Sequence, residues 1–324
     1  MKDIARRVGV CTATVSLALR NHPSIPEGTQ KRIQLYAKKI GYTPHPFVSA
    51  LMAERRRVKK NDLKAIIAIL SPYQQSEIQL NPFLLRFHQT AHDYARSRGF
   101  NLELHCVAGL SDEGEALYRM LSHRGVSGII LCDFIDQQHS FSLSAFEWNR
   151  FCVVHYGYHS KIPPFHRVHH HVVQPFRTLL QEIQMRGFIR PGLLMNETLS
   201  RLSQNYWSMT LRDWYFTEKK ENWHFLYLED TEEKKIRKWI AQSKIDLLLT
   251  IDPPLWIRGL TTVPWVNLNE TSCKGHFIGI WNNYEAVAQS AINLLEGLLI
   301  RNEKGIPENP CEILSFAKVL LNST

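Results

Sequence analysis

The side chains best placed for chemistry lie in TATVSLALRN, residues 12–21. Val15, Ala18 and Leu19 recur at the spacing of one buried helical face. The opposite face carries hydroxyl and small apolar groups near the start of the helix. A threonine hydroxyl donates or accepts hydrogen bonds, and its methyl group, like alanine or leucine, makes apolar contacts. The chemistry of this face is recognition, and what it recognises depends on the charge around it.

The positive charge of the chain is concentrated beside this helix. Residues 1–60 carry thirteen Lys or Arg against three acidic residues, a net charge of +10, while the other 264 residues sum to −1. An excess confined to one small segment indicates a binding surface for a polyanion, because phosphate neutralisation supplies most sequence-independent affinity for DNA. The alternative is a solvated basic surface without a partner. If the polyanion is DNA, Thr12, Ala13 and Leu17 should face base edges, with Thr14, Ser16 and Arg20 beside them.

Three short helices are expected to position these side chains. The first spans residues 3–8 and ends at Gly9, where a tight turn favours a residue that tolerates positive φ. The second spans residues 12–20. Pro26 starts the third in its first turn, and Gly41 ends it. The inward face of the third helix is predicted to consist of Ile33, Ala37 and Ile40. This is the helix-turn-helix plan, in which the start of the second helix enters the major groove.

The motifs DIARRVGVCTATVSLALRN, IPEGTQKRI and GYTPHPFVSALMAERRR follow one another at family spacing. Residues 1–57 therefore resemble the head of the LacI family of transcriptional regulators. The resemblance implies a homodimer on a palindromic operator in double-stranded DNA, with one hinge helix from each subunit in the minor groove. Leu51 matches the leucine wedged at the central base step; packing against the regulatory domain is its alternative role. The expected DNA-contacting set is completed by Tyr42, His45, Leu51, Arg55 and Arg56.

The head departs from the family pattern at several positions. Cys11 replaces a serine that caps the recognition helix, and Arg20 replaces an asparagine. In the hinge, His45 and Ser49 replace an asparagine and an arginine. We expect these changes to affect DNA affinity and to leave the fold intact.

From about residue 63 apolar runs alternate with amphipathic helices. Strands are predicted at residues 65–70, 102–107, 128–132, 151–156, 192–195, 225–228, 246–251 and 265–268, and helices at 82–98, 112–124, 173–186 and 232–243. This order predicts parallel sheets with right-handed crossovers in two three-layer lobes. SHRGVSGIIL, MRGFIRPGLLM and IGIWNNYEAVAQSAINLLEGLL resemble the periplasmic-binding-protein-like core of the same family.

The expected fold is thus a small all-α helix-turn-helix domain followed by an α/β two-lobed core. The helix-turn-helix domain is assigned to residues 1–43, the hinge helix and basic linker to 44–62, and the effector-binding and dimerisation domain to 63–324.

A small effector is expected between the lobes, because parallel sheets bind ligands at the carboxyl ends of their strands. Polar residues at strand ends and aromatic residues with flat faces are the candidates, although such aromatic residues are more often part of the core. A sugar is the leading expectation, and a nucleobase or other metabolite is the alternative. The candidate contacts are Tyr73, Phe83, His171, Asn205, Trp207, Asp252, Asn269 and Trp281.

Other functional classes find little support. The six cysteines form no CxxC pair, which favours buried thiols in a reducing compartment. Consecutive histidines at 169–171 cannot all face one ion, so neither a metal nor a cofactor is expected. No nucleophile elbow, phosphate loop or zinc-protease motif occurs, so the chain is not expected to be an enzyme. No signal peptide or membrane segment is found, which predicts a cytoplasmic protein. The second hypothesis is a small-molecule-binding protein whose head has lost its DNA role.

Overall fold

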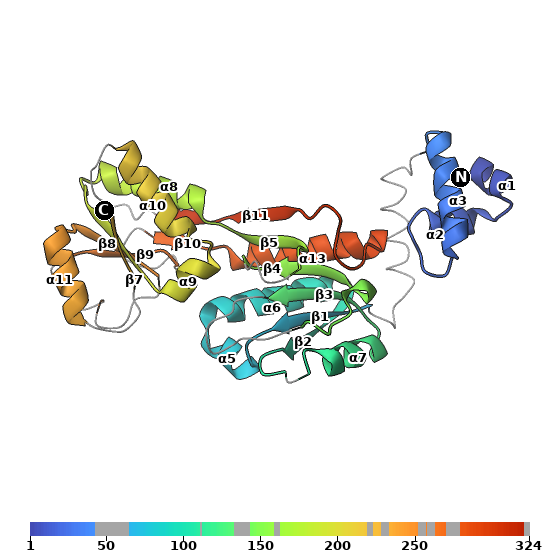
Figure 1. Ribbon diagram of the computed structural model, residues 1–324, viewed down its shortest axis with the longest axis horizontal. Coiled ribbons are helices and arrows are strands. Elements are labelled where there is room, and N and C mark those ends of the chain that lie inside the picture. Colours follow the sequence, from blue (N-terminus) through green and yellow to red (C-terminus); the bar gives the residue numbers. More distant parts are fainter. Residues whose placement is uncertain are drawn as a thin grey trace.

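The computed structural model describes residues 1–42, 65–110, 112–132, 143–158, 163–218, 223–227, 233–251, 257, 263–269 and 279–320. They form an N-terminal helical head and a larger core of two lobes (Figure 1). The predicted hinge and linker, residues 44–62, lie outside the described residues.

The head consists of α1 (Lys2–Val8), α2 (Thr12–Ala18) and α3 (Glu27–Lys39). One residue pair from each helix builds its core: Ile4 and Ala5, Val15 and Ala18, Ile33 and Ala37. Gly9 ends α1 with φ 73°, in the left-handed region expected of that turn. The predicted three helices are confirmed, but the inward placement of Ile40 is wrong. Ile40 is 45% exposed because it is the C-cap of α3, where the chain leaves the core.

The first lobe is built on a parallel sheet with strand order β11-β5-β4-β3-β1-β2. Its strands are β1 (Ala65–Ser71), β2 (Phe100–Cys106), β3 (Val126–Cys132), β4 (Cys152–Tyr156), β5 (His166–His171) and β11 (Glu312–Phe316). The helices α6 (Pro82–Ser97) and α13 (Tyr284–Arg301) cover one face, and α7 (Glu115–His123) covers the other. The helix α5 (Gln75–Leu80) precedes α6, and the short helix η1 (Trp148–Arg150) precedes β4.

The second lobe has the same three-layer plan around a parallel sheet of order β7-β6-β8-β9. These strands are β6 (Pro191–Met195), β7 (His224–Tyr227), β8 (Leu247–Thr250) and β9 (Trp265–Asn267). The helices α8 (Val173–Met185) and α10 (Tyr206–Thr217) cover one face, and α11 (Glu233–Ser243) covers the other. The helix α9 (Glu197–Leu202) follows β6.

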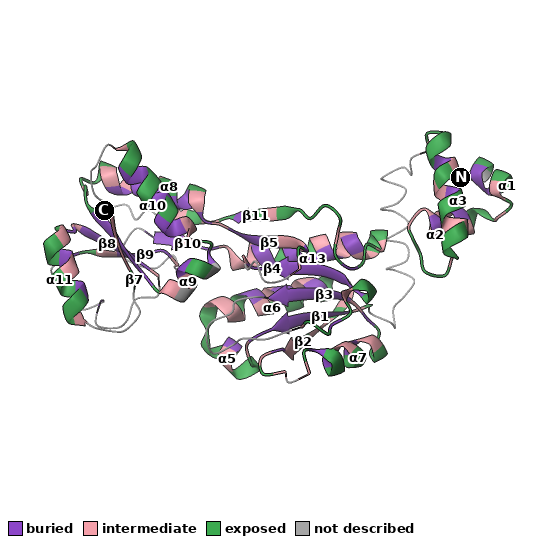
Figure 2. Ribbon diagram, viewed as in Figure 1, coloured by how far each residue is buried: buried purple, intermediate pink, exposed green. Residues whose placement is uncertain are grey.

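The chain crosses between the lobes three times in the described residues. It passes from β5 into α8, from β10 (Gly279–Trp281) into α13, and from β11 into β12 (Lys318–Leu320), which pairs antiparallel with β10. The strands β1, β3 and β4 are buried at the centre of the first lobe, and the outer helix faces are exposed (Figure 2). All eight predicted strands and the four predicted helices are found, and their ends coincide with the prediction or differ from it by at most three residues. No helix in the described ranges has the length and apolar character that a bilayer crossing requires.

Candidate functional site

The start of α2 is open to solvent, as expected for a recognition helix. Thr12 and Ala13 are exposed, whereas Thr14, Ser16 and Leu17 are half-buried. Because Val15 and Ala18 anchor the opposite face in the head core, the exposed side chains are held on a fixed helix. The first turn of α2 is the part of the head best able to enter a groove.

A thiol caps this helix. The Cys11 Sγ accepts a hydrogen bond from the Thr14 backbone N–H at 3.4 Å and lies 3.1 Å from Thr14 Oγ1. These contacts lower the pKa of the Cys11 thiol, the side-chain hydrogen bond to Thr14 being the larger cause. The serine-to-cysteine departure therefore keeps the capping geometry with a weaker acceptor.

Two further predicted residues have structural partners. Arg20 Nε donates to the Ser16 carbonyl oxygen at 2.8 Å and Arg20 Nη2 donates to Ser16 Oγ at 3.0 Å, so the guanidinium lies along α2. Tyr42 is half-buried and packs against the head core. The remaining predicted DNA contacts, His45, Leu51, Arg55 and Arg56, lie outside the described residues.

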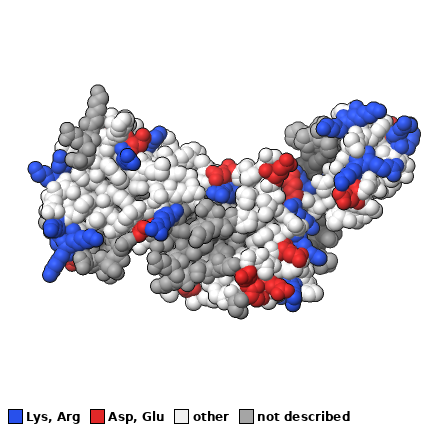
Figure 3. Space-filling model, viewed as in Figure 1, with Lys and Arg blue, Asp and Glu red and all other residues white. Residues whose placement is uncertain are grey.

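Cationic side chains gather on the face of the head seen in Figure 3. They are exposed on α1 at Arg6 and Arg7 and on α3 at Lys31, Arg32, Lys38 and Lys39. Lys31 pairs with Glu27 at 2.6 Å, an exposed pair that leaves the surface positive overall. This distribution suits contacts with a phosphate backbone, which position a protein without reading sequence.

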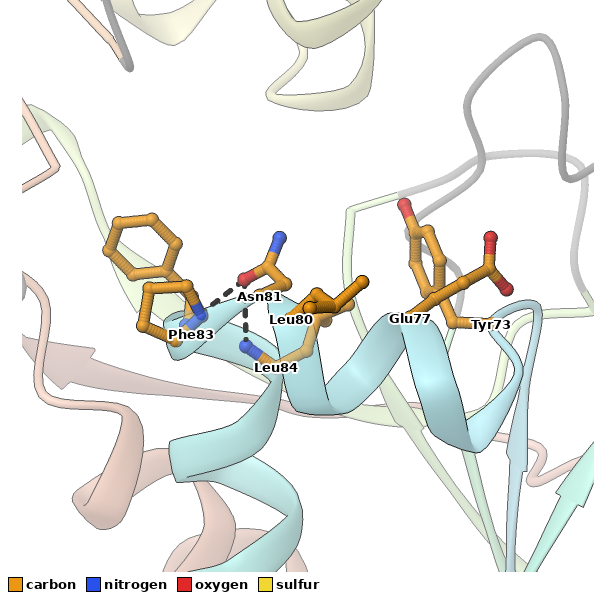
Figure 4. Close-up of a pocket in the computed structure, with 7 residues that line it drawn as sticks. Tyr73, Glu77, Leu80, Asn81, Phe83 and Leu84 are labelled. Carbon is orange, nitrogen blue, oxygen red and sulfur yellow. Dashed lines mark hydrogen bonds between the residues drawn. The ribbon is translucent and has the colours of Figure 1, made fainter.

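In the core, the predicted effector contacts Tyr73 and Phe83 lie at the two ends of one pocket (Figure 4). Both line a cavity of about 500 Å³ beyond the carboxyl end of β1, with Glu77, Leu80, Asn81, Pro82 and Leu84. The rings of Tyr73 and Phe83 rise on the same side of the α5–α6 segment (Figure 4). The cavity is open to solvent along the exposed residues Leu80, Asn81 and Pro82.

Asn269 links the two lobes at the crossing beside this cavity. Its Oδ1 accepts hydrogen bonds from Asn282 Nδ2 at 2.8 Å and from the Tyr284 hydroxyl at 3.1 Å. Asn269 follows β9 of the second lobe, whereas Tyr284 begins α13 of the first. The Tyr284 ring lies 5.4 Å from the Phe83 ring, which connects the link to the cavity wall.

The buried ring of His170 packs against the ring of Tyr284. The His170 ring lies 4.6 Å from the Tyr284 ring, and His170 Nε2 lies 3.2 Å from the Tyr156 hydroxyl. Burial lowers the pKa of His170 to about 3, so the ring is neutral at neutral pH. Its Nδ1 has no hydrogen-bond partner within the described part of the chain.

The other histidines of β5 face separate partners. His166 Nδ1 accepts from the Cys311 backbone N–H at 3.1 Å, His169 Nε2 lies 3.6 Å from Glu312, and His171 stacks on Phe316 at 4.7 Å. His171 Nδ1 also accepts the Gln174 backbone N–H at 3.3 Å, so this predicted effector contact has local partners at the crossing. The described residues contain no group of three metal-ligating side chains.

The structure corrects one predicted contact and places two others. Trp207 is 4% exposed and packs against Phe176 at 5.1 Å in the core of the second lobe, so the prediction that its face stacks on a ligand is wrong. Asn205 precedes α10 with φ 59°, and its Oδ1 accepts from Ser200 Oγ at 2.9 Å. Trp281 lies on β10 with Lys318 Nζ 5.7 Å from its ring. Asp252 lies outside the described residues.

Sequence reasoning missed Asn81, Asn282, Tyr284 and His170. Asn81 had a visible indication, because an asparagine directly before a proline and an apolar helix is typical of an N-cap. Asn282 and Tyr284 depend on contacts with Asn269 at the junction of the lobes, and His170 depends on the packing of β5 against β4 and α13. No local pattern reveals either arrangement.

The head matches the family model for bacterial regulatory proteins of the lacI family over residues 1–45. The N-terminal domain is a LacI-family helix-turn-helix domain. The LacI-type head is also similar to curated repressors. The HTH-type transcriptional repressor CytR of Escherichia coli K12 is 37% identical over 70 residues, which are 22% of this chain and 18% of CytR. The repressor PurR of Photobacterium profundum is 28% identical over 138 residues, 42% of this chain and 37% of PurR. The matched segments thus span from about a fifth to under two fifths of these relatives.

Solved structures of transcriptional regulators share the fold over nearly the whole chain. A complex of the transcriptional regulator CelR with cellobiose has a TM-score of 0.60 at 13% identity and covers 98% of this chain and 97% of its own. The Lac repressor dimer bound to operator and the anti-inducer ONPF has a TM-score of 0.58 at 14% identity, covering 98% and 96%. At these identities the likeness establishes the fold: a LacI-type head followed by a two-lobed periplasmic-binding-protein-like core.

Proposed function

We propose that this protein is a sequence-specific DNA-binding transcriptional regulator, acting as a repressor, that binds a palindromic operator as a homodimer. The observation that carries the proposal is the exposed start of α2 on a basic head that matches the LacI-family model. Thr12, Ala13 and Leu17 read base edges, and the exposed cations of α1 and α3 bind phosphates. A reading helix this poor in long polar side chains recognises only a half-site weakly, so two heads act together.

A small effector bound between the lobes controls the head. Tyr73 and Phe83 supply the aromatic wall, and Asn269 together with Tyr284 couples the two lobes. A ligand that binds one lobe arrangement better than the other shifts the population toward it. The three crossings transmit the change in lobe arrangement to the proposed hinge helices, which become ordered or disordered on DNA. The protein acts by binding and performs no catalysis.

The effector is proposed to be a sugar or a sugar derivative, with a nucleobase as the alternative. Aromatic side chains stack on either ring, and the structurally similar CelR is in complex with cellobiose. The proposed effector contacts from the second lobe and the crossings are His171, Asn205, Trp281 and Asp252.

Selection of bound duplexes from a random DNA library by the full-length protein tests the regulator function. We expect enrichment of a palindrome with a flexible central step, at near-physiological salt. The matched variant Thr12→Ala should lose part of the half-site preference and keep the salt-dependent binding.

Binding that merely fades as salt rises, with no sequence enriched by the wild-type protein, would contradict the regulator function. It would favour a small-molecule-binding protein with a disabled head.

A further inference from the structure

We infer that Asn302, which caps the C-terminal end of α13, is a positioning residue for the head: it holds the turn after the recognition helix against the first lobe. Through this contact α13 joins the link between the lobes to the DNA-reading domain. The inference rests on the proposed function, because it takes α2 to read DNA. It adds a direct route from the core to the head beside the proposed hinge helices.

A hydrogen bond connects the head to the core. The Nδ2 of Asn302 donates to the backbone carbonyl oxygen of Asn21, in the turn between α2 and α3. A carbonyl oxygen only accepts, so the atom of the Asn302 amide that faces it is the nitrogen. Because the acceptor is a backbone atom, the contact holds the chain of the turn itself.

The turn that receives this hydrogen bond is tied to two helices of the head. Asn21 has φ 53°, in the left-handed region, and its N–H donates to the Ala18 carbonyl oxygen at 3.2 Å. Its Oδ1 accepts from Gln34 Nε2 at 2.6 Å, and the same nitrogen donates to the Ala18 carbonyl oxygen at 3.0 Å. Ala18 ends α2 and Gln34 belongs to α3, so a displacement of Asn21 moves both helices together.

The core side of the contact is also fixed. Asn302 ends α13 with φ 55°, and its N–H donates to the Leu299 carbonyl oxygen at 3.3 Å. The next N–H, that of Glu303, donates to the Leu298 carbonyl oxygen at 3.0 Å. The apolar face of α13 is buried in the core of the first lobe, so Asn302 moves with that lobe.

The helix α13 carries one polar contact at each end. Its first residue, Tyr284, donates to Asn269 of the second lobe, and its C-cap, Asn302, donates to the head. Its 18 residues span about 27 Å, at 1.5 Å per residue. Figure 1 shows it running from the junction of the lobes toward the head. In a dimer the two first lobes therefore set the separation of the heads, which has to match the spacing of the half-sites.

The strength of this contact suits a switch. Loss of one such hydrogen bond changes the ratio of docked to free heads by about fivefold, which corresponds to about 1 kcal/mol. A donor and an acceptor separated by about 3.6 Å no longer form a hydrogen bond. A small displacement of the first lobe is therefore enough to release the head.

Two substitutions remove the contact and keep the end of α13. Asn302→Gly loses the amide, and glycine adopts the left-handed conformation of a helix end without strain. Asn302→Asp keeps the shape of the side chain and places an acceptor against the Asn21 carbonyl oxygen. The matched control is Asn293→Asp, the same exchange within α13, where Oδ1 still accepts from the Tyr94 hydroxyl at 2.9 Å.

The first measurement is the time-resolved fluorescence anisotropy of the full-length protein without DNA. A fluorescent amino acid takes the place of Leu35, which is 70% exposed on α3. A docked head tumbles with the core, whereas a free head adds a faster decay. We expect both substitutions of Asn302 to raise the ratio of fast to slow amplitude by about fivefold, and Asn293→Asp to leave it unchanged.

The second measurement compares the operator obtained by duplex selection with a duplex that carries a single half-site. Both Asn302 variants should bind the operator more weakly by about fivefold for each head, because the spacing of the heads is no longer held. They should bind the half-site as the wild-type protein does, since one head needs no spacing.

Equal fast amplitudes in the wild-type protein and in both Asn302 variants would overturn the inference. Equal losses on the operator and the half-site would do the same, as would a rise in Asn293→Asp as large as that in Asn302→Asp. Failure of the proposed function gives a different result. In that case the motion of the head depends on Asn302, while duplex selection enriches no palindrome.

Discussion

At the scale of single residues, the cap of the recognition helix offers a direct test of the head. Cys11→Ser places a hydroxyl oxygen, a stronger acceptor than sulfur, beside the Thr14 N–H. We expect the first turn of α2 to open less often. Amide hydrogen exchange at Thr14 should therefore slow by about threefold, which corresponds to a modest stabilisation of the helix by its N-cap. Cys11→Ala should accelerate the same exchange. Equal rates in all three proteins would show that the thiol contributes nothing to the cap.

The buried His170 predicts how stability depends on pH. The pKa of His170 is about 3 in the folded protein and returns to its ordinary value near 6.5 on unfolding. Between these values the unfolded chain binds a proton that the folded chain does not, so stability is complete above pH 6.5 and falls as the pH falls toward 3. This residue alone should lower the free energy of unfolding by about 1 kcal/mol between pH 7.5 and pH 5.5.

Urea unfolding of the wild-type protein and of His170→Gln at the two pH values measures this contribution. The variant should lose less stability on acidification than the wild-type protein. Some pH dependence should persist, because burial also lowers the pKa of His88 to about 4. An identical loss in both proteins would contradict the assignment to His170.

At the scale of elements, regular apolar patterns predicted most of the fold and local contacts explain the rest. Continuous apolar runs such as β1 and β3 are buried at the centre of the first lobe, so hydrophobicity alone located them. The strands β10, β11 and β12 were not predicted, because β10 and β12 form a two-stranded sheet at the crossing and β11 carries exposed Leu314 and Phe316. Trp207 shows what sequence patterns cannot distinguish. An aromatic residue near a strand end has the same sequence pattern whether its ring faces a ligand or the hydrophobic core.

The hinge element carries a prediction from sequence alone. Leu51→Ala removes the proposed wedge, so it should weaken binding to the selected operator by about tenfold, or about 1.4 kcal/mol, and change non-specific binding little. Arg56→Ala should weaken both kinds of binding alike and reduce the salt slope by about one unit. Fluorescence anisotropy on operator and scrambled duplexes over a salt series measures both. Equal losses on the two duplexes for Leu51→Ala would remove the wedge role.

At the scale of the whole molecule, polar contacts couple the lobes within the described residues, among them the hydrogen bonds from Tyr284 to Asn269 and from Gln204 to the Tyr158 carbonyl oxygen. The three crossings allow the lobes to pivot, because only one or two residues separate the elements on either side of each crossing. The hydrogen bond from Tyr284 to Asn269 spans the pivot and lies next to the cavity wall at Phe83. This hydrogen bond is therefore positioned to determine the angle between the lobes when a ligand enters or leaves the cavity.

Tyr284→Phe tests that coupling, and the chain provides a matched control. The Tyr94 hydroxyl donates to Asn293 Oδ1 at 2.9 Å, a hydrogen bond of the same kind that joins α6 to α13 within the first lobe. Loss of either bond should cost about 1 kcal/mol of stability. Only Tyr284→Phe should also widen the distribution of distances between fluorophores placed on the two lobes, and shift the effector concentration that half-releases operator. If Tyr94→Phe produced the same changes, they would be due to the loss of stability and not to the loss of coupling. A hydrogen bond confined to one lobe cannot bias the angle between the two lobes.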